Sequence, residues 1–346
     1  MARPSADAIS PAVQQAMRDA HLLLLPDTVT PEAVDVLLRQ RVDDSRLLEV
    51  GRARLGRRSS ISGPFQLDDD TALAVHVPGP WNLAYVVQAP IERDVAAFGD
   101  IADPVQRAWW MRLFADGKPF REEGDAVDLA LALARRLGGA LRIGRRPVLV
   151  QPAASRLLDL TVWSPSWVGP GRLLAAVART LPGAAVDLGG AAWAGPAEPS
   201  PDDEPLDVGQ LDVLHASDDR LRLAAAVVGA VNDGRALAAP DVVDGYEVLA
   251  DDDLRVAVTY EDHVPPWVRR RLADRTPDAG PLVTLTVGWL PADVIRLESE
   301  QPPFTFQRSR ELVRPRVRAT ARVLAELTHG VVTDADGFEV DRYSLR

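Results

Sequence analysis

Cysteine is absent from the 346-residue chain, and lysine occurs once, at Lys118. The lack of cysteine excludes a disulfide framework and a zinc site with thiolate ligands. No hydrophobic run approaches the roughly 20 apolar residues that a membrane-spanning helix needs, because Leu22–Leu25 is followed at once by Pro26 and Asp27. The first residues also lack the basic, apolar and small-residue pattern of a secretory signal. We therefore expect a cytoplasmic protein without a membrane segment.

Motifs for bound metals and cofactors are missing as well. The five histidines include no two at the spacing of a helical or hairpin metal site. Gly169-Pro170-Gly171 precedes a predicted helix but lacks the third glycine and the Lys-Ser/Thr pair of a phosphate-binding loop. No Gly-x-Ser-x-Gly nucleophile motif occurs. We predict no metal and no cofactor.

The chain carries a net charge of −11. This charge disfavours binding to nucleic acid or to an anionic membrane and favours a cationic protein partner. Arginines nevertheless cluster at residues 39–58 and 308–322. They could form a phosphate-binding surface, but aromatic residues for base stacking are not interleaved with them. Solvated helix faces that pair with nearby acidic residues explain both clusters more simply.

The order of apolar runs and turn residues predicts an α+β fold, with two mixed halves built mainly on antiparallel sheets. Residues 195–209 are rich in proline and acidic residues, a composition that cannot bury apolar surface. The predicted organisation is a helical N-terminal segment (1–60), a first α+β domain (61–194), a linker or loop (195–209) and a second α+β domain (210–346).

Individual elements follow from periodicity, capping residues and turn signals. The predicted helices begin at Pro11 and Pro31 and cover residues 44–55, 104–114, 125–137, 171–181, 266–275 and 315–328. The predicted strands cover residues 71–77, 82–88, 140–143, 147–150, 158–163, 184–188, 246–250, 254–261, 282–290, 331–333 and 338–343.

Two segments follow the same order of helix, glycine, strand, turn and strand. Ala130, Leu133, Ala134 and Gly139 align with Ala321, Leu324, Ala325 and Gly330. The match predicts an internal duplication of an α+β unit. Two unrelated amphipathic helices that each end at glycine would show the same features.

The C-terminal end carries the pattern Ala321-x-x-Leu324-Ala325-x-x-Thr328-x-Gly330-Val331-Val332-x-Asp334. This pattern resembles the end of certain bacterial α+β domains of unknown function, some of which are immunity proteins found beside secreted toxins. The resemblance implies a non-catalytic role, in which an acidic surface captures a specific and often basic protein partner.

The densest group of titratable side chains is Tyr260-Glu261-Asp262-His263, at the end of a predicted strand. Alternate residues of a strand share a face, so Glu261 and His263 could cooperate in acid–base chemistry, with Tyr260 as a third candidate. A solvated strand end before Pro266 is the simpler interpretation of the same residues.

Partner-binding candidates are two adjacent tryptophans and two groups of aspartates: Trp109, Trp110, Asp202, Asp203, Asp251, Asp252 and Asp253. Tryptophan is enriched at interface hot spots, and acidic residues attract a basic partner over long distances. Adjacent helical residues cannot both face one core, so one tryptophan should lie at an edge. We predict a non-catalytic protein-binding module, immunity-like or scaffolding. The alternatives are an enzyme of unrecognised class that uses Glu261 and His263, and a structural or assembly component.

Overall fold

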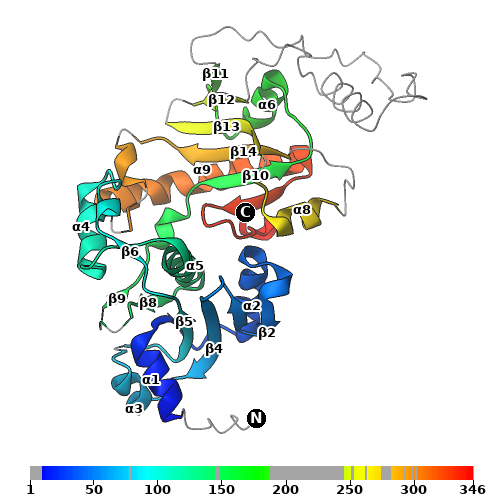
Figure 1. The fold of residues 1–346 in the computed structure, drawn as a ribbon. Helices are drawn as coiled ribbons and strands as arrows, with labels where there is room; N and C mark the ends of the chain where they lie inside the picture. The colour runs from blue at the N-terminus through cyan, green and yellow to red at the C-terminus, as the bar shows by residue number, and fades with distance from the viewer. Residues whose placement is uncertain are drawn as a thin grey trace, which may run out of the picture. The chain divides into compact units, whose positions relative to one another are not determined.

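The structure is a computed structural model, and it describes residues 10–77, 79–144, 146, 148–187, 245–250, 253–261, 263–273, 282–291, 293–297, 299–300 and 302–345. The chain divides into two compact units (Figure 1). Unit 1 comprises Met1–Arg156 and Asp293–Gln307, and unit 2 comprises Leu157–Ala292 and Arg308–Arg346. Each unit contains an antiparallel sheet and helices, which confirms the predicted α+β fold with two sheet-rich halves. None of the described helices is both long enough and apolar enough to cross a membrane.

Unit 1 is built on a seven-stranded sheet with the order β2-β3-β4-β5-β1-β8-β9, beside the small β6–β7 pair. Its helices are α1 (Pro11–Asp19), α2 (Pro31–Arg41), α3 (Asp69–Ala74), α4 (Pro104–Leu113) and α5 (Arg121–Leu137). Its strands are β1 (His21–Leu25), β2 (Leu47–Glu49), β3 (Arg52–Arg54), β4 (Ser60–Gln66), β5 (Leu83–Gln88), β6 (Arg93–Asp94), β7 (Lys118–Pro119), β8 (Ala140–Arg142) and β9 (Leu149–Val150).

Strand β1 lies in the interior of this sheet, between β5 and β8, and all five of its residues are buried. Leu22 and Leu24 pack with Met17 of α1 and Val75 beside α3. The alternate residues face α5, whose helix contacts β1, β5 and β8. Because helices cover both faces, β1 reads as an unbroken apolar run rather than an alternating one.

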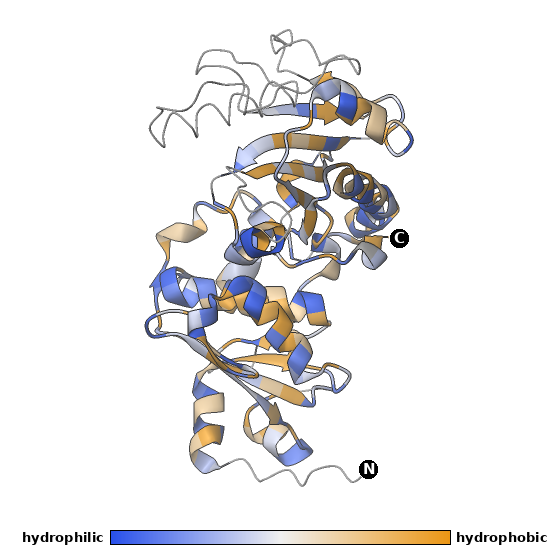
Figure 2. Cartoon of the chain, turned by 90° about the vertical axis from the view of Figure 1, so that its right-hand side faces the viewer, coloured by the Kyte–Doolittle hydropathy of each residue, from blue (hydrophilic) through white to orange (hydrophobic). Residues whose placement is uncertain are grey.

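Unit 2 is built on a six-stranded sheet with the order β11-β12-β13-β14-β10-β15. Its elements are β10 (Leu160–Ser164), α6 (Pro170–Val177), β11 (Ala185–Asp187), β12 (Gly245–Leu249), β13 (Leu254–Glu261), α8 (Pro266–Ala273), β14 (Leu282–Trp289), α9 (Phe304–Thr328) and β15 (Val331–Asp334). Helix α9 runs along one face of this sheet (Figure 1). Helix α8 packs Trp267 and Val268 against Trp163 and Val331. In Figure 2, hydrophobic residues recur along the strands of both sheets.

The two sheets share one connection order. In each, a first strand (β1 or β10) is followed by a helix and four antiparallel strands, the last of which pairs with the first strand. A long helix (α5 or α9) then leads to a strand on the other side of the first one. The helix ends also match, because the N–H of Gly139 bonds to Ala134 O (2.7 Å) and that of Gly330 to Ala325 O (3.1 Å). The shared order supports the predicted internal duplication.

Three predictions near the N-terminus are wrong. The segment 1–60 is not simply helical, since β1, β2 and β3 lie within it. Residues 44–55 form a short 3-10 turn and two strands, because Gly51 takes a left-handed φ of 74° and turns the chain back. Residues 71–77 were predicted as a strand but begin within α3, whose N-terminus is capped when Asp68 accepts a hydrogen bond from Thr71 N (2.7 Å).

The C-terminal region differs from the prediction in two places. Helix α9 begins at Phe304 rather than at Pro315, and it continues through that proline. Residues 338–343 contribute a single bridge between Thr333 and Glu339 instead of a strand. The compact units also differ from the predicted domains, because unit 2 begins at Leu157, inside the predicted first domain. The predicted linker 195–209 lies outside the described residues and stays a prediction.

We expect Gly139→Ala to destabilise the protein more than Gly138→Ala. A Cβ at Gly139 would lie 2.4 Å from Leu24 O, so β1 or α5 must shift, at a cost of about 1–3 kcal/mol added to any backbone effect. At Gly138 a Cβ meets nothing within 4 Å, and the left-handed φ of 67° alone costs about 1 kcal/mol. Urea unfolding of both variants measures the difference, and equal losses would contradict this account.

Candidate functional site

A pocket of about 560 Å³ lies at one end of the unit 1 sheet, where the ends of β5, β1 and β8 come together. We call it the His21 pocket. Its lining combines small apolar residues with five charged side chains and His21: Ala16, Asp19, Ala20, His21, Val87, Gln88, Ala89, Ile91, Arg93, Asp116, Glu123, Ile143, Gly144 and Arg146. A pocket with apolar walls and a few convergent polar groups is the usual form of a binding site.

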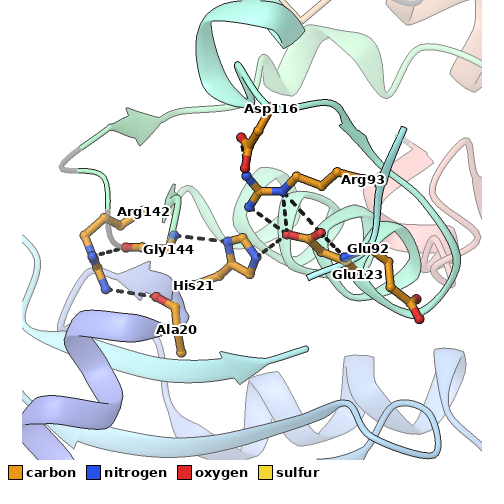
Figure 3. Close-up of polar contacts among 8 residues, drawn as sticks. All are labelled: Ala20, His21, Glu92, Arg93, Asp116, Glu123, Arg142 and Gly144. Atoms are coloured by element: carbon orange, nitrogen blue, oxygen red, sulfur yellow. Dashed lines mark hydrogen bonds and ion pairs between the residues drawn. The ribbon is translucent and has the colours of Figure 1, made fainter. Parts of the chain in front are cut away.

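His21 is the first residue of β1, and its side chain points toward α5 (Figure 3). Its Nδ1 accepts a hydrogen bond from the backbone N–H of Gly144 (3.1 Å). Its Nε2 lies 3.5 Å from Oε1 of Glu123. This geometry assigns the neutral tautomer with the proton on Nε2, because Nδ1 must supply a lone pair to Gly144. Both ring nitrogens are therefore engaged within the protein.

Glu123 stands in the first turn of α5, and its side chain is only 1% exposed. Oε2 accepts the backbone N–H of Glu92 (2.8 Å), and Oε1 accepts a hydrogen bond from Nη2 of Arg93 (2.9 Å). Burial alone would raise the pKa of Glu123, but hydrogen bonds from His21, Arg93 and the Glu92 N–H outweigh burial and lower this pKa. Glu123 is therefore a buried, ionised carboxylate.

Arg93 continues this chain of contacts toward the surface. Its Nη1 lies 2.5 Å from Asp116, and its guanidinium lies over the ring of Phe114 (5.0 Å to the centroid). Asp116 is 54% exposed and also lies 3.7 Å from Arg146. His21, Glu123, Arg93, Asp116 and Arg146 thus form a chain from the core to the pocket rim. We call it the ion chain.

Arg142 fixes the wall of the pocket from behind. Its side chain is fully buried. It donates hydrogen bonds to the carbonyl oxygens of Ala20 and Gly144 (Figure 3) and to that of Met17. These bonds cap the C-terminal end of α1 and hold the β8–β9 turn against it. Burial lowers the pKa of Arg142 to about 10, so the guanidinium stays charged at neutral pH.

The described part of unit 2 does not repeat the ion chain. When α5 and α9 are aligned at Gly139 and Gly330, Arg314 occupies the position of Glu123. The first strands can be aligned in the same way, because Gly139 lies against Leu24 O and Gly330 lies against Trp163 O. Leu24 of β1 therefore corresponds to Trp163 of β10. Three residues earlier, Leu160 takes the place of His21. Among the described residues no three His, Asp or Glu side chains group to hold a metal ion.

The two predicted tryptophans lie on α4 in different environments. Trp109 is buried, with 5% of its surface exposed. Trp110 is half-buried and stacks on Phe114 with a centroid distance of 5.6 Å. One tryptophan therefore faces the core while the other lies at its edge. A role for Trp110 in partner binding stays a prediction.

The predicted acid–base group lies in unit 2. His263 Nδ1 is 3.7 Å from Glu261 Oε1, and the His263 side chain is 99% exposed. Glu261 accepts the backbone N–H of His263 (2.8 Å), so it caps a turn. Tyr260 instead stacks on Trp167 with a centroid distance of 5.0 Å. The pair therefore stands on open surface rather than in a pocket.

Of the predicted aspartates, Asp253 lies on the β12–β13 turn, exposed and with a left-handed φ of 62°. Asp202, Asp203, Asp251 and Asp252 lie outside the described residues. The residues of the ion chain were not predicted from the sequence. One feature of the sequence could have indicated the site: His21 is the single polar residue of the run His21–Leu25, all of which is buried.

Glu123→Gln should lower the free energy of unfolding at pH 7 by about 3 kcal/mol, since Arg93 would lose its buried partner. The lowered pKa of Glu123 contributes stability above the ordinary value of 4.5, and this contribution is lost as pH falls through the folded-state pKa. The difference between variant and wild type should therefore shrink below pH 4.5. Urea unfolding from pH 3 to pH 7 measures it.

Glu49→Gln is the matched control. Glu49 is 61% exposed and pairs with Arg52 on the surface, so this variant should lose less than about 0.5 kcal/mol at any pH. An equal loss in both variants, or a Glu123→Gln effect that does not change with pH, would contradict the ionised state of Glu123.

No family model, curated protein or solved structure matches this chain. The resemblance of the C-terminal end to immunity-type domains therefore stays a prediction.

Proposed function

We propose that this protein is a non-catalytic protein-binding module, immunity-like or scaffolding, and that the His21 pocket receives a basic side chain of its partner. The observation that carries the proposal is Asp116 at the outer end of the ion chain. Its carboxylate is half exposed, and the exposed guanidinium of Arg146 approaches it only to 3.7 Å. A guanidinium or ammonium group from a partner fits the same place.

The charge of the pocket supports a cationic occupant. The lining residues carry three carboxylates, on Asp19, Asp116 and Glu123, against two guanidinium groups, on Arg93 and Arg146. With His21 neutral, one negative charge is in excess. An acidic protein attracts a basic partner over several ångströms, so association should slow as salt is raised.

The apolar part of the pocket fits the aliphatic portion of a lysine or arginine side chain. Val87 and Ile143 line the wall, and Ile91 also lines the pocket while 76% of its surface is exposed. Long basic side chains bury their aliphatic stems along such surfaces while the charged end finds a carboxylate. Both ring nitrogens of His21 are engaged, which favours binding over acid–base catalysis.

Photo-crosslinking in the source cells tests this proposal. With p-benzoylphenylalanine at Ile91 we expect an adduct with one partner protein, and the crosslinked peptide should contain arginine or lysine beside the attachment point. The same group at Leu73, which is 78% exposed on α3, should give no such adduct. Mass spectrometry of the adducts identifies the peptide.

Asp116→Asn should reduce the Ile91 adduct about tenfold, because it removes a charge-assisted contact. Asp43→Asn is the control, since Asp43 is exposed and its side chain caps nothing. An adduct that survives Asp116→Asn, or a crosslinked peptide without basic residues, would contradict a basic occupant. An adduct between two copies of this chain would favour an assembly component instead.

A further inference from the structure

A second hollow, of about 570 Å³, lies beside the start of α5 in unit 1. Five charged residues line it: Arg57, Arg58, Glu92, Arg121 and Glu122. We call it the arginine hollow. Arg57 and Arg58 come from the loop between β3 and β4, Glu92 directly precedes β6, and Arg121 and Glu122 open α5.

The two carboxylates of the hollow are already bound by the protein. Glu92 meets Nη2 of Arg58 at 2.5 Å through Oε1 and accepts the backbone N–H of Glu122 (3.1 Å) through Oε2. Glu122 accepts the backbone N–H of Arg58 (2.8 Å) and the hydroxyl of Ser59 (3.1 Å). The Arg58 N–H is the main cause of the lowered pKa of Glu122. Both carboxylates are therefore held in place by the protein.

The other two arginines have no such partner. Arg57 and Arg121 are exposed, and among the described residues neither guanidinium has a carboxylate within ion-pair distance. Arg121 lies over the ring of Phe120 instead, 5.0 Å from its centroid. Stacking leaves the N–H groups at the guanidinium edge available to an acceptor. Three arginines against two carboxylates give the hollow a net positive charge within a protein of net charge −11.

We propose that the arginine hollow binds an oxyanion, a carboxylate or a phosphate group, which accepts hydrogen bonds from both Arg57 and Arg121. Arginine suits such groups because its planar edge offers paired donors. The locked Glu92 and Glu122 hold Arg58 and the start of α5 in place, so the hollow keeps its shape when the anion leaves. This site goes beyond the proposed function, since it needs no protein partner and prefers the opposite charge.

Titration of the 15N-labelled full chain with inorganic phosphate at constant ionic strength tests the site. We expect saturable shifts of the backbone amide signals of Arg58, Ser59 and Glu122. Arg57→Gln and Arg121→Gln should each weaken phosphate binding about tenfold, because each removes a charge-assisted hydrogen bond. Arg54→Gln, at an exposed arginine of β3 outside the hollow, should leave the affinity unchanged.

A parallel titration with acetate separates the two ligand sources. Equal affinity for acetate and phosphate would identify a carboxylate site. A preference of about tenfold for phosphate would identify a phosphate site, because the second negative charge of phosphate then contributes to binding. Shifts that do not saturate, or a loss of affinity in Arg54→Gln as large as in Arg57→Gln, would overturn the proposal. Both arginines are exposed, so the variants should fold, and their amide spectra check this.

Discussion

The carboxylate of Glu123 is the contact on which the candidate site depends. It is almost fully buried, and burial of an unpaired carboxylate costs several kcal/mol. Two segments supply its partners: β1 through His21, and residues 92–93 through the Glu92 N–H and the guanidinium of Arg93. If the start of α5 moved away from these segments, the buried carboxylate would lose its partners. One ion fixes the floor of the His21 pocket.

Two short stretches of backbone separate two hollows of opposite charge preference. Glu92 and Arg93 are consecutive, and so are Glu122 and Glu123. Arg93 and Glu123 line the His21 pocket, whereas Glu92 and Glu122 line the arginine hollow. Neighbouring residues of an extended segment point to opposite sides, which explains the separation at Glu92 and Arg93. An excess of negative charge on one side and of positive charge on the other follows from the local fold.

The sequence predicted those elements whose signals are local. Helix α5 follows from Leu129, Leu133 and their i+4 spacing, together with the terminating Gly138. Strand β1 was missed because it is buried on both faces, and a run of leucines without alternation does not distinguish a strand from a helix. The prediction of the α+β class was still correct, because buried and less buried residues alternate along strands of unit 2 such as β13.

The candidate site could not be predicted in the same way. His21, Arg93 and Glu123 are widely separated in sequence, and only the pairing of β1 with β5 and β8 and the packing of α5 bring them together. Adjacency in sequence suggested Glu261 and His263 instead. The two side chains lie 3.7 Å apart, but that of His263 is 99% exposed and that of Glu261 is 40% exposed, and an ion pair in such a place contributes little.

A comparison of equivalent positions in the two units distinguishes residues that the fold requires from residues that only the His21 pocket uses. Ala130, Leu133 and Ala134 and their counterparts on α9 are all buried, because a long helix must pack its small and apolar residues on the sheet. The positions of His21 and Glu123 are not constrained in this way, since unit 2 folds with leucine and arginine there. A costly buried ion pair that the topology does not need is best explained by the surface that it organises, where Arg93 holds Asp116 at the pocket rim.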